Sequence, residues 1–206
     1  WSTLHQEAVS GQDNPIGLWT YNRWRYEIPY SGFNSSSIAF QGLPALEWQT
    51  LAAFFNLLGA GYLKGYRFYC TLASQQYDGV GYFEMAKDDT AIYHGLTNPL
   101  GIPEERFDRD SIRRSTIRNF IGFKMSTDDL VRDIQRGDKQ LRDIKWLVCW
   151  EKGSLHTTEG IAIDEVLDEH QRGHREFYGV TDIMRDASTT VHVIRLEKVV
   201  EILRLT

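Results

Sequence analysis

The sequence predicts an α/β protein with a mixed central sheet flanked by helices. An amphipathic helical segment begins near Pro44, and strand-like apolar runs follow it, the most apolar of them at residues 144–150. The composition is that of a globular chain, with 42% hydrophobic and 25% charged residues. At 206 residues, the chain has room for one domain and an ordered extension.

The first 43 residues differ in composition from the rest. They are rich in Ser, Gly, Asn and aromatic residues, and Trp19, Tyr21, Trp24 and Tyr26 alternate with polar residues as in a strand. We expect residues 1–43 to be an extension that packs on the domain, or a linker from a preceding domain, and residues 44–206 to be the domain. Because the chain begins at Trp1, we expect it to be a segment of a longer protein.

The elements of the domain follow from local signals. Pro44 suits the first turn of a helix over residues 44–58, which Gly59 ends. Ser126 and Asp129 form a capping-box pattern for a helix over residues 127–136. Strands are predicted at residues 66–72, 80–85, 91–94, 117–125, 144–150 and 191–196, helices at 163–170 and 197–205, and a polar insertion at 95–116.

The net charge, the two cysteines and the motifs of the sequence limit the classes of function that the protein can have. A net charge of −5 argues against a protein that holds nucleic acid by bulk positive charge, but it permits an enzyme with a local basic patch and a metal ion. Cys70 and Cys149 lie in apolar runs and are expected to be buried thiols of a cytoplasmic protein. No apolar run approaches the ~20 residues of a membrane span, so no membrane partner is expected. The phosphate-binding loop, dinucleotide-binding and serine-hydrolase signatures are absent from the sequence.

Glu47 is the first candidate site residue. At helical spacing it falls on the side opposite Gln49 and Asn56, beside Leu51. A carboxylate on an apolar face is costly unless it is paired or binds a metal. The alternative is a residue at the rim of that face that reaches solvent.

Asp78 and Lys124 are the next candidates. Asp78 precedes a glycine between two strand-like runs, which also describes an ordinary turn. Lys124 ends a strand and shares a face with Phe120 and Gly122, where a solvated lysine is the simple alternative. Two carboxylates and a lysine that meet at one sheet edge could hold Mg²⁺ and act on a phosphodiester.

The segments that carry these residues resemble a known family. They are residues 43–62 with Glu47, the Tyr77-Asp78-Gly79 turn, and Phe123-Lys124 followed by residues 144–151. Their order resembles the PD-(D/E)XK restriction-endonuclease-like fold. More narrowly, they are similar to a nuclease-like domain at the C-terminus of bacterial GHKL-type (MORC-like or Hsp90-like) ATPases. The resemblance covers residues 43–152 and, more loosely, the last strand and helix.

The resemblance implies a DNA-acting domain of a bacterial defence or repair protein, with Mg²⁺ as cofactor. Asp78, Glu47 and the Phe123 carbonyl would hold the metal, and Lys124 would orient or deprotonate the attacking water. The family's acidic residue two positions before the lysine falls on Gly122, so Glu47 or another acid such as Glu84 would have to compensate.

Two further expectations accompany this interpretation. If DNA binds, Arg109, Arg113 and Arg114 of the insertion are the expected phosphate contacts. The alternative function is a catalytically degenerate module of the same fold, used for homodimerisation, partner docking or DNA positioning. The covalently linked partner would be an N-terminal ATPase domain.

Overall fold

The computed structural model describes residues 36–38, 42–71, 76–116, 118–154, 157–158, 160–168 and 172–204. The predicted aromatic strand in residues 1–43 lies outside them. Within the described residues, no helix is both long and apolar enough to span a bilayer.

The helices and strands follow one another in an order close to the predicted one. The elements are α3 (Glu47–Gly59), β1 (Tyr66–Thr71), β2 (Gly79–Ala86), η1 (Glu104–Arg106), β3 (Ile112–Arg114), β4 (Asn119–Ser126), α4 (Thr127–Gln135), η2 (Leu141–Asp143), β5 (Ile144–Glu151), β6 (Thr157–Thr158), β7 (Ile161–Glu165), η3 (Arg172–His174), β8 (Asp182–Arg185), β9 (Thr190–Arg195) and α5 (Leu196–Leu203).

The strands form one mixed sheet. In the described part of the chain, eight of them pair in the order β1-β2-β4-β5-β9-β8-β7-β6, and β3 pairs with β2 beside this path. The pairs β4–β5 and β5–β9 are parallel, whereas the remaining pairs are antiparallel. The predicted α/β class with a mixed central sheet is confirmed. The C-terminal ends of β4, β5 and β9 therefore lie at the same edge of the sheet.

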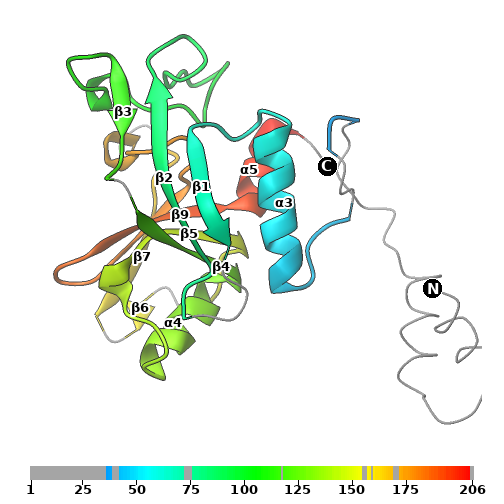
Figure 1. The fold of residues 1–206 in the computed structure, drawn as a ribbon, viewed down its shortest axis with the longest axis vertical. Helices are drawn as coiled ribbons and strands as arrows, with labels where there is room; N and C mark the ends of the chain where they lie inside the picture. The colour runs from blue at the N-terminus through cyan, green and yellow to red at the C-terminus, as the bar shows by residue number, and fades with distance from the viewer. Residues whose placement is uncertain are drawn as a thin grey trace, which may run out of the picture.

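Helices cover both faces of the sheet (Figure 1). The larger core cluster joins α3 and α5 to sheet residues that include Phe123, Trp146 and Val148. The smaller cluster joins Leu130 of α4 to Leu147 and other sheet residues on the opposite face. Strand β5 lies between these two layers and has five buried residues of eight, which explains its apolar run.

Helix α3 packs through a stripe of buried residues and begins later than predicted. Thr50, Ala53, Phe54 and Leu57 are its buried positions. Leu46 is the N-cap, so Pro44 precedes the helix instead of opening it. Glu47 is consequently the first helical residue, where its side chain lies at the rim of the buried stripe.

The cap of α4 connects the end of β4 to the helix. The Asp129 carboxylate accepts hydrogen bonds from the Ser126 backbone N–H at 2.8 Å and from the Ser126 hydroxyl at 3.0 Å. The predicted capping box is confirmed. Because Ser126 follows Lys124 by two residues, this cap sets where α4 begins relative to that lysine.

Removing the capping hydroxyl should weaken the helix start. Ser126→Ala is expected to lower the free energy of unfolding by about 0.5–2 kcal/mol, the usual range for a lost N-cap. Urea unfolding followed by far-ultraviolet circular dichroism measures the change. Ser188→Ala, which alters an exposed turn, is the control and should shift stability by less than about 0.5 kcal/mol. Equal shifts in the two variants would contradict the capping role.

Three expectations from the sequence were wrong. Residues 91–94 form turns in which Ile92 and His94 make only isolated bridges, because the next residues turn back at once. Where a helix was expected at residues 163–170, residues 163–165 belong instead to the strand β7, which pairs with β8. The acidic residues Asp164 and Glu165 of β7 form ion pairs across the sheet. Cys70 is exposed because β1 is an edge strand, whereas Cys149 is buried.

Candidate functional site

Asp78 lies in the turn that leads into β2 and is held against β4. Its Oδ2 accepts a hydrogen bond from the Phe123 backbone N–H at 2.8 Å and lies 3.0 Å from Lys139 Nζ. The preceding residue, Tyr77, anchors this turn because its hydroxyl donates to Asp143 and its ring stacks on Phe120. The Asp78 carboxylate is therefore fixed beside the second half of β4.

Gly122 faces Asp78 across a short gap. A Cβ built on Gly122 would lie 3.7 Å from Asp78 Oδ2, which is ordinary van der Waals contact. A carboxylate two residues before Lys124 would thus stand beside Asp78. The chain has a glycine there, so this second carboxylate is missing at a position where there is space for it.

Lys124 is buried near the end of β4 between two carboxylates. Its Nζ lies 2.9 Å from Glu47 Oε2 and 3.1 Å from Asp133 Oδ2. Burial by itself would lower the pKa of Lys124, but the hydrogen bonds and charges of Glu47 and Asp133 outweigh it and raise the pKa above its ordinary value. Lys124 is therefore a protonated, positively charged group at neutral pH.

Two residues of this site were missed by the sequence analysis. Lys139, in the loop between α4 and β5, is only 7% exposed at its side chain and lies 4.0 Å from Asp133 as well as 3.0 Å from Asp78. Asp133, on α4, thus connects the two lysines. Asp133 follows the buried Leu130 by three residues, and this helical spacing could have indicated that both lie on the same face of the helix. The loop position of Lys139 gave no such indication.

These contacts form one group, which we call the β4 cluster: Glu47, Asp78, Lys124, Asp133 and Lys139. Three carboxylates alternate with two ammonium groups along it. The structure therefore links Asp78 to Lys124 and Glu47 through Asp133 and Lys139. Lys124 lies on the face of β4 that also carries Gly122, beside Asp78. The Glu47 side chain is 47% exposed, so the cluster is open to solvent at that end.

The cluster has the donor chemistry that a hard divalent cation requires, because such ions prefer carboxylate oxygens. The described residues contain no group of three or more metal-ligating side chains close together. Instead, the Lys139 ammonium group stands between Asp78 and Asp133 as a stand-in cation. Asp78 and Asp133 are accordingly the residues that would hold a metal, with Lys139 displaced. Phe123 contributes its N–H to Asp78.

The arginines expected to contact DNA lie elsewhere. Strand β3 pairs with the C-terminal end of β2, whereas Asp78 precedes the N-terminal end of β2. Arg113 pairs with Glu176 at 2.8 Å, and Arg114 pairs with Glu84 at 2.8 Å. Arg109 is exposed on the same insertion. The structure therefore does not bring these arginines to the β4 cluster, and Glu84 is paired far along β2 from Asp78.

Comparison with protein-family models, curated proteins and solved structures found no match for this chain.

Proposed function

We propose that this chain is a DNA-acting domain of restriction-endonuclease-like architecture that hydrolyses phosphodiester bonds with a divalent metal ion at the β4 cluster. The observation that carries the proposal is the series of ion pairs that links Glu47, Lys124 and Asp78 through Asp133 and Lys139, although these residues lie far apart in the sequence. The element order also supports it. The resemblance expects a helix, a strand, an aspartate, a strand, Phe-Lys, a helix and a strand, and the chain has α3, β1, Asp78, β2, Phe123-Lys124 on β4, α4 and β5 in this sequence order.

The residues of the cluster have separate roles in this proposal. Asp78 and Asp133 would hold the metal ion, which when bound would supply Lewis-acid stabilisation of charge on the phosphate. Lys124, being protonated, stabilises negative charge and positions the attacking water instead of taking its proton. Glu47 holds the Lys124 ammonium group at 2.9 Å and is itself solvent-exposed, so it can orient Lys124 from the open side.

The test is cleavage of plasmid and linear DNA by the full chain with Mg²⁺, with Mn²⁺ and with EDTA. We expect metal-dependent cutting, and we expect Lys124→Ala and Asp78→Asn each to reduce it by about 100-fold or more. The asparagine keeps an oxygen that can accept from the Phe123 N–H, so the turn should remain in place.

Matched variants control for nonspecific effects of the substitutions. Lys198→Ala removes a half-buried lysine on α5, outside the β4 cluster, and Asp89→Asn removes an exposed carboxylate; both variants should cut like the unmodified chain. Cutting that resists EDTA, or that survives both cluster substitutions, would contradict the proposal.

A second candidate function is favoured by Gly122 and Lys139. In this alternative, Lys139 is a permanent positive charge that replaces the metal ion, and the domain is a non-catalytic module that positions DNA or docks a partner or a second copy. No cutting under any metal condition would be expected. DNA retention in a mobility-shift assay, or dimerisation in sedimentation, would be unchanged by Lys124→Ala.

For either candidate, we propose the cellular setting that the resemblance implies. The domain would belong to a cytoplasmic bacterial defence or repair protein and would be linked to an ATPase domain.

A further inference from the structure

A polar cavity of about 110 Å³ lies over β8 and β9, on the face of the sheet opposite α4. We call it the β8–β9 pocket. Because Thr190 and His192 begin β9 and Lys124 lies near the end of the parallel strand β4, the pocket and the β4 cluster are at different ends of the sheet. The pocket is lined by Arg106, His174, Glu176, Ile183, Arg185, Thr190 and His192.

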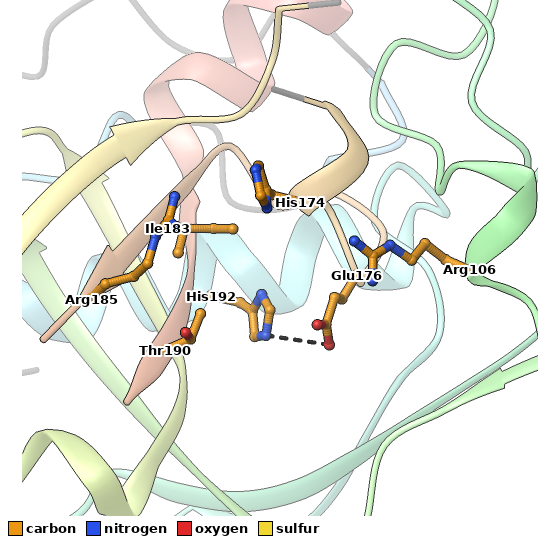
Figure 2. Close-up of a pocket in the computed structure, with 7 residues that line it drawn as sticks. All are labelled: Arg106, His174, Glu176, Ile183, Arg185, Thr190 and His192. Carbon is orange, nitrogen blue, oxygen red and sulfur yellow. Dashed lines mark ion pairs between the residues drawn. The ribbon is translucent and has the colours of Figure 1, made fainter. Parts of the chain in front are cut away.

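The side chains that line the pocket come from four separate segments. Figure 2 shows His174 and His192 facing each other, with Arg185 on one side and Glu176 and Arg106 on the other. Arg106 reaches in from η1 and donates a hydrogen bond to the Gly173 carbonyl. Its guanidinium has five N–H donors, so this bond leaves others for a ligand.

His192 is the most informative lining residue because it is buried without full hydrogen bonding. It is only 1% exposed, and its Nδ1 has no hydrogen-bond partner among the described residues. Arg185 Nε, another buried atom of the pocket, also lacks a partner there. Buried polar atoms are normally hydrogen-bonded, and an unpaired one is costly. A ligand in the cavity would satisfy both atoms.

The surroundings of His192 carry excess positive charge. Burial, followed by the charges of Lys145, Arg113 and Arg106, lowers the pKa of His192 to about 3. Glu176 opposes this field, but it is already paired with Arg113 at 2.8 Å, and Arg185 pairs with Asp164 at 3.1 Å. His192 is therefore neutral at pH 7, and the cationic groups around it favour an anion.

The geometry around His192 also indicates that the anion should carry a hydrogen-bond donor. The Nε2 atom faces the Glu176 carboxylate at 3.7 Å, so the proton of the neutral imidazole is best placed on Nε2. The unpartnered Nδ1 is then an acceptor. A ligand must offer negative oxygens to Arg106 and Arg185 and a hydroxyl hydrogen to His192.

We infer that the β8–β9 pocket binds a small phosphate that carries a hydroxyl hydrogen. Hydrogenphosphate meets both requirements, and a hydroxyl-bearing phosphate ester such as a nucleoside monophosphate is the other source of the same chemistry. The cavity has the volume of a few water molecules at about 30 Å³ each, which is enough for a five-atom tetrahedral anion. The Thr190 hydroxyl on its wall adds a further donor or acceptor.

Isothermal titration calorimetry of the full chain near pH 7 tests the inference with inorganic phosphate as the probe. We expect saturable one-to-one binding. Arg106→Gln and Arg185→Gln should each weaken it by about tenfold or more, the effect of a lost charge-assisted hydrogen bond. Arg109→Gln removes the same charge from the insertion that carries Arg106 but does not line the pocket, so it should leave binding unchanged.

Two further ligands test whether the hydroxyl hydrogen is needed and whether the natural ligand is free phosphate or an ester. Sulfate has the same shape and charge as hydrogenphosphate but no hydroxyl hydrogen, and should bind about tenfold more weakly. A nucleoside 5′-monophosphate that binds more tightly than inorganic phosphate would identify an ester as the natural source, whereas weaker binding would identify free phosphate.

Specific outcomes would overturn the inference. They are no saturable phosphate binding at millimolar concentrations, binding that neither arginine substitution changes, or equal binding of sulfate and phosphate. If an arginine variant fails to fold, Thr190→Val provides the test, because it keeps the side-chain shape and should weaken phosphate binding several-fold. None of these outcomes bears on DNA cleavage at the β4 cluster.

Discussion

Replacing Arg175 by methionine is expected to lower the free energy of unfolding by about 3–5 kcal/mol, because three buried carbonyls lose their donor at a cost of about 1–3 kcal/mol each. Arg175 is fully buried and donates hydrogen bonds to the carbonyls of Pro99, Gly101 and Val166. Its guanidinium also lies over the Tyr93 ring. This one side chain therefore ties the insertion to the segment after β7.

The charge on Arg175 is retained under ordinary conditions. Burial lowers its pKa to about 10, which is still well above neutrality. Methionine fills much of the same volume but cannot donate, so three buried carbonyls would lose a charged donor. The loss of stability should appear together with faster hydrogen exchange in residues 91–102.

Urea unfolding of Arg175→Met and of Arg142→Met measures the effect against a matched control. Arg142 has a side chain that is 74% exposed, so its replacement should cost less than about 1 kcal/mol. A loss below about 1 kcal/mol for Arg175→Met would show that the insertion is not held by these hydrogen bonds.

Lys139→Met is expected to make the stability of the protein depend on divalent cations. The substitution leaves Asp78 and Asp133 without the ammonium group that stands between them, so the variant should be less stable than the unmodified chain in EDTA. Mg²⁺ or Mn²⁺ should then occupy the vacated position. At 100 times the dissociation constant, binding contributes about 2.7 kcal/mol, which raises the melting temperature by roughly 5–10 °C for a chain of this size.

Thermal unfolding with increasing Mn²⁺ measures this dependence, with Lys198→Met as the control lysine variant. A second variant, Gly122→Asp, restores the missing carboxylate beside Asp78 and should add to the metal response, whereas Gly122→Ala should not. A melting temperature that rises with Mn²⁺ in the unmodified chain supports the metal-dependent nuclease. A rise in the variants alone supports Lys139 as the replacement for the metal. No response in any variant would remove the β4 cluster as a cation site.

The elements that were predicted well are those whose burial is regular along the chain. The stripe that buries Ala53, Phe54 and Leu57 has helical spacing, and β5 is apolar from Trp146 to Trp150 because both of its faces are covered. The segment that became β7 has apolar residues at positions 161, 163 and 166, which fit either period. Its pairing with β8 decided the outcome, and that contact lies about twenty residues away.

The candidate site likewise contains some residues that the sequence indicated and others that only the structure revealed. Glu47, Asp78 and Lys124 each showed a local signal: a carboxylate on a helix face, an Asp-Gly turn and a charge at a strand end. The residues that pair with them showed no such local signal. Lys139 is an ordinary surface residue by sequence, yet its side chain is 7% exposed because the loop after α4 folds over Asp78. The unpaired Nδ1 of His192 likewise becomes visible only with the pocket around it.

Spacing along this chain is sufficient to establish an α/β protein with a capped helix after Lys124 and an apolar central strand, because those features depend on neighbours within a few residues. The tertiary structure decided that Lys139 stands between two carboxylates, that Arg106 and Arg185 face one cavity, and that Gly122 leaves a gap beside Asp78. Those facts depend on contacts between side chains dozens of residues apart, and such contacts exist only once the sheet has paired.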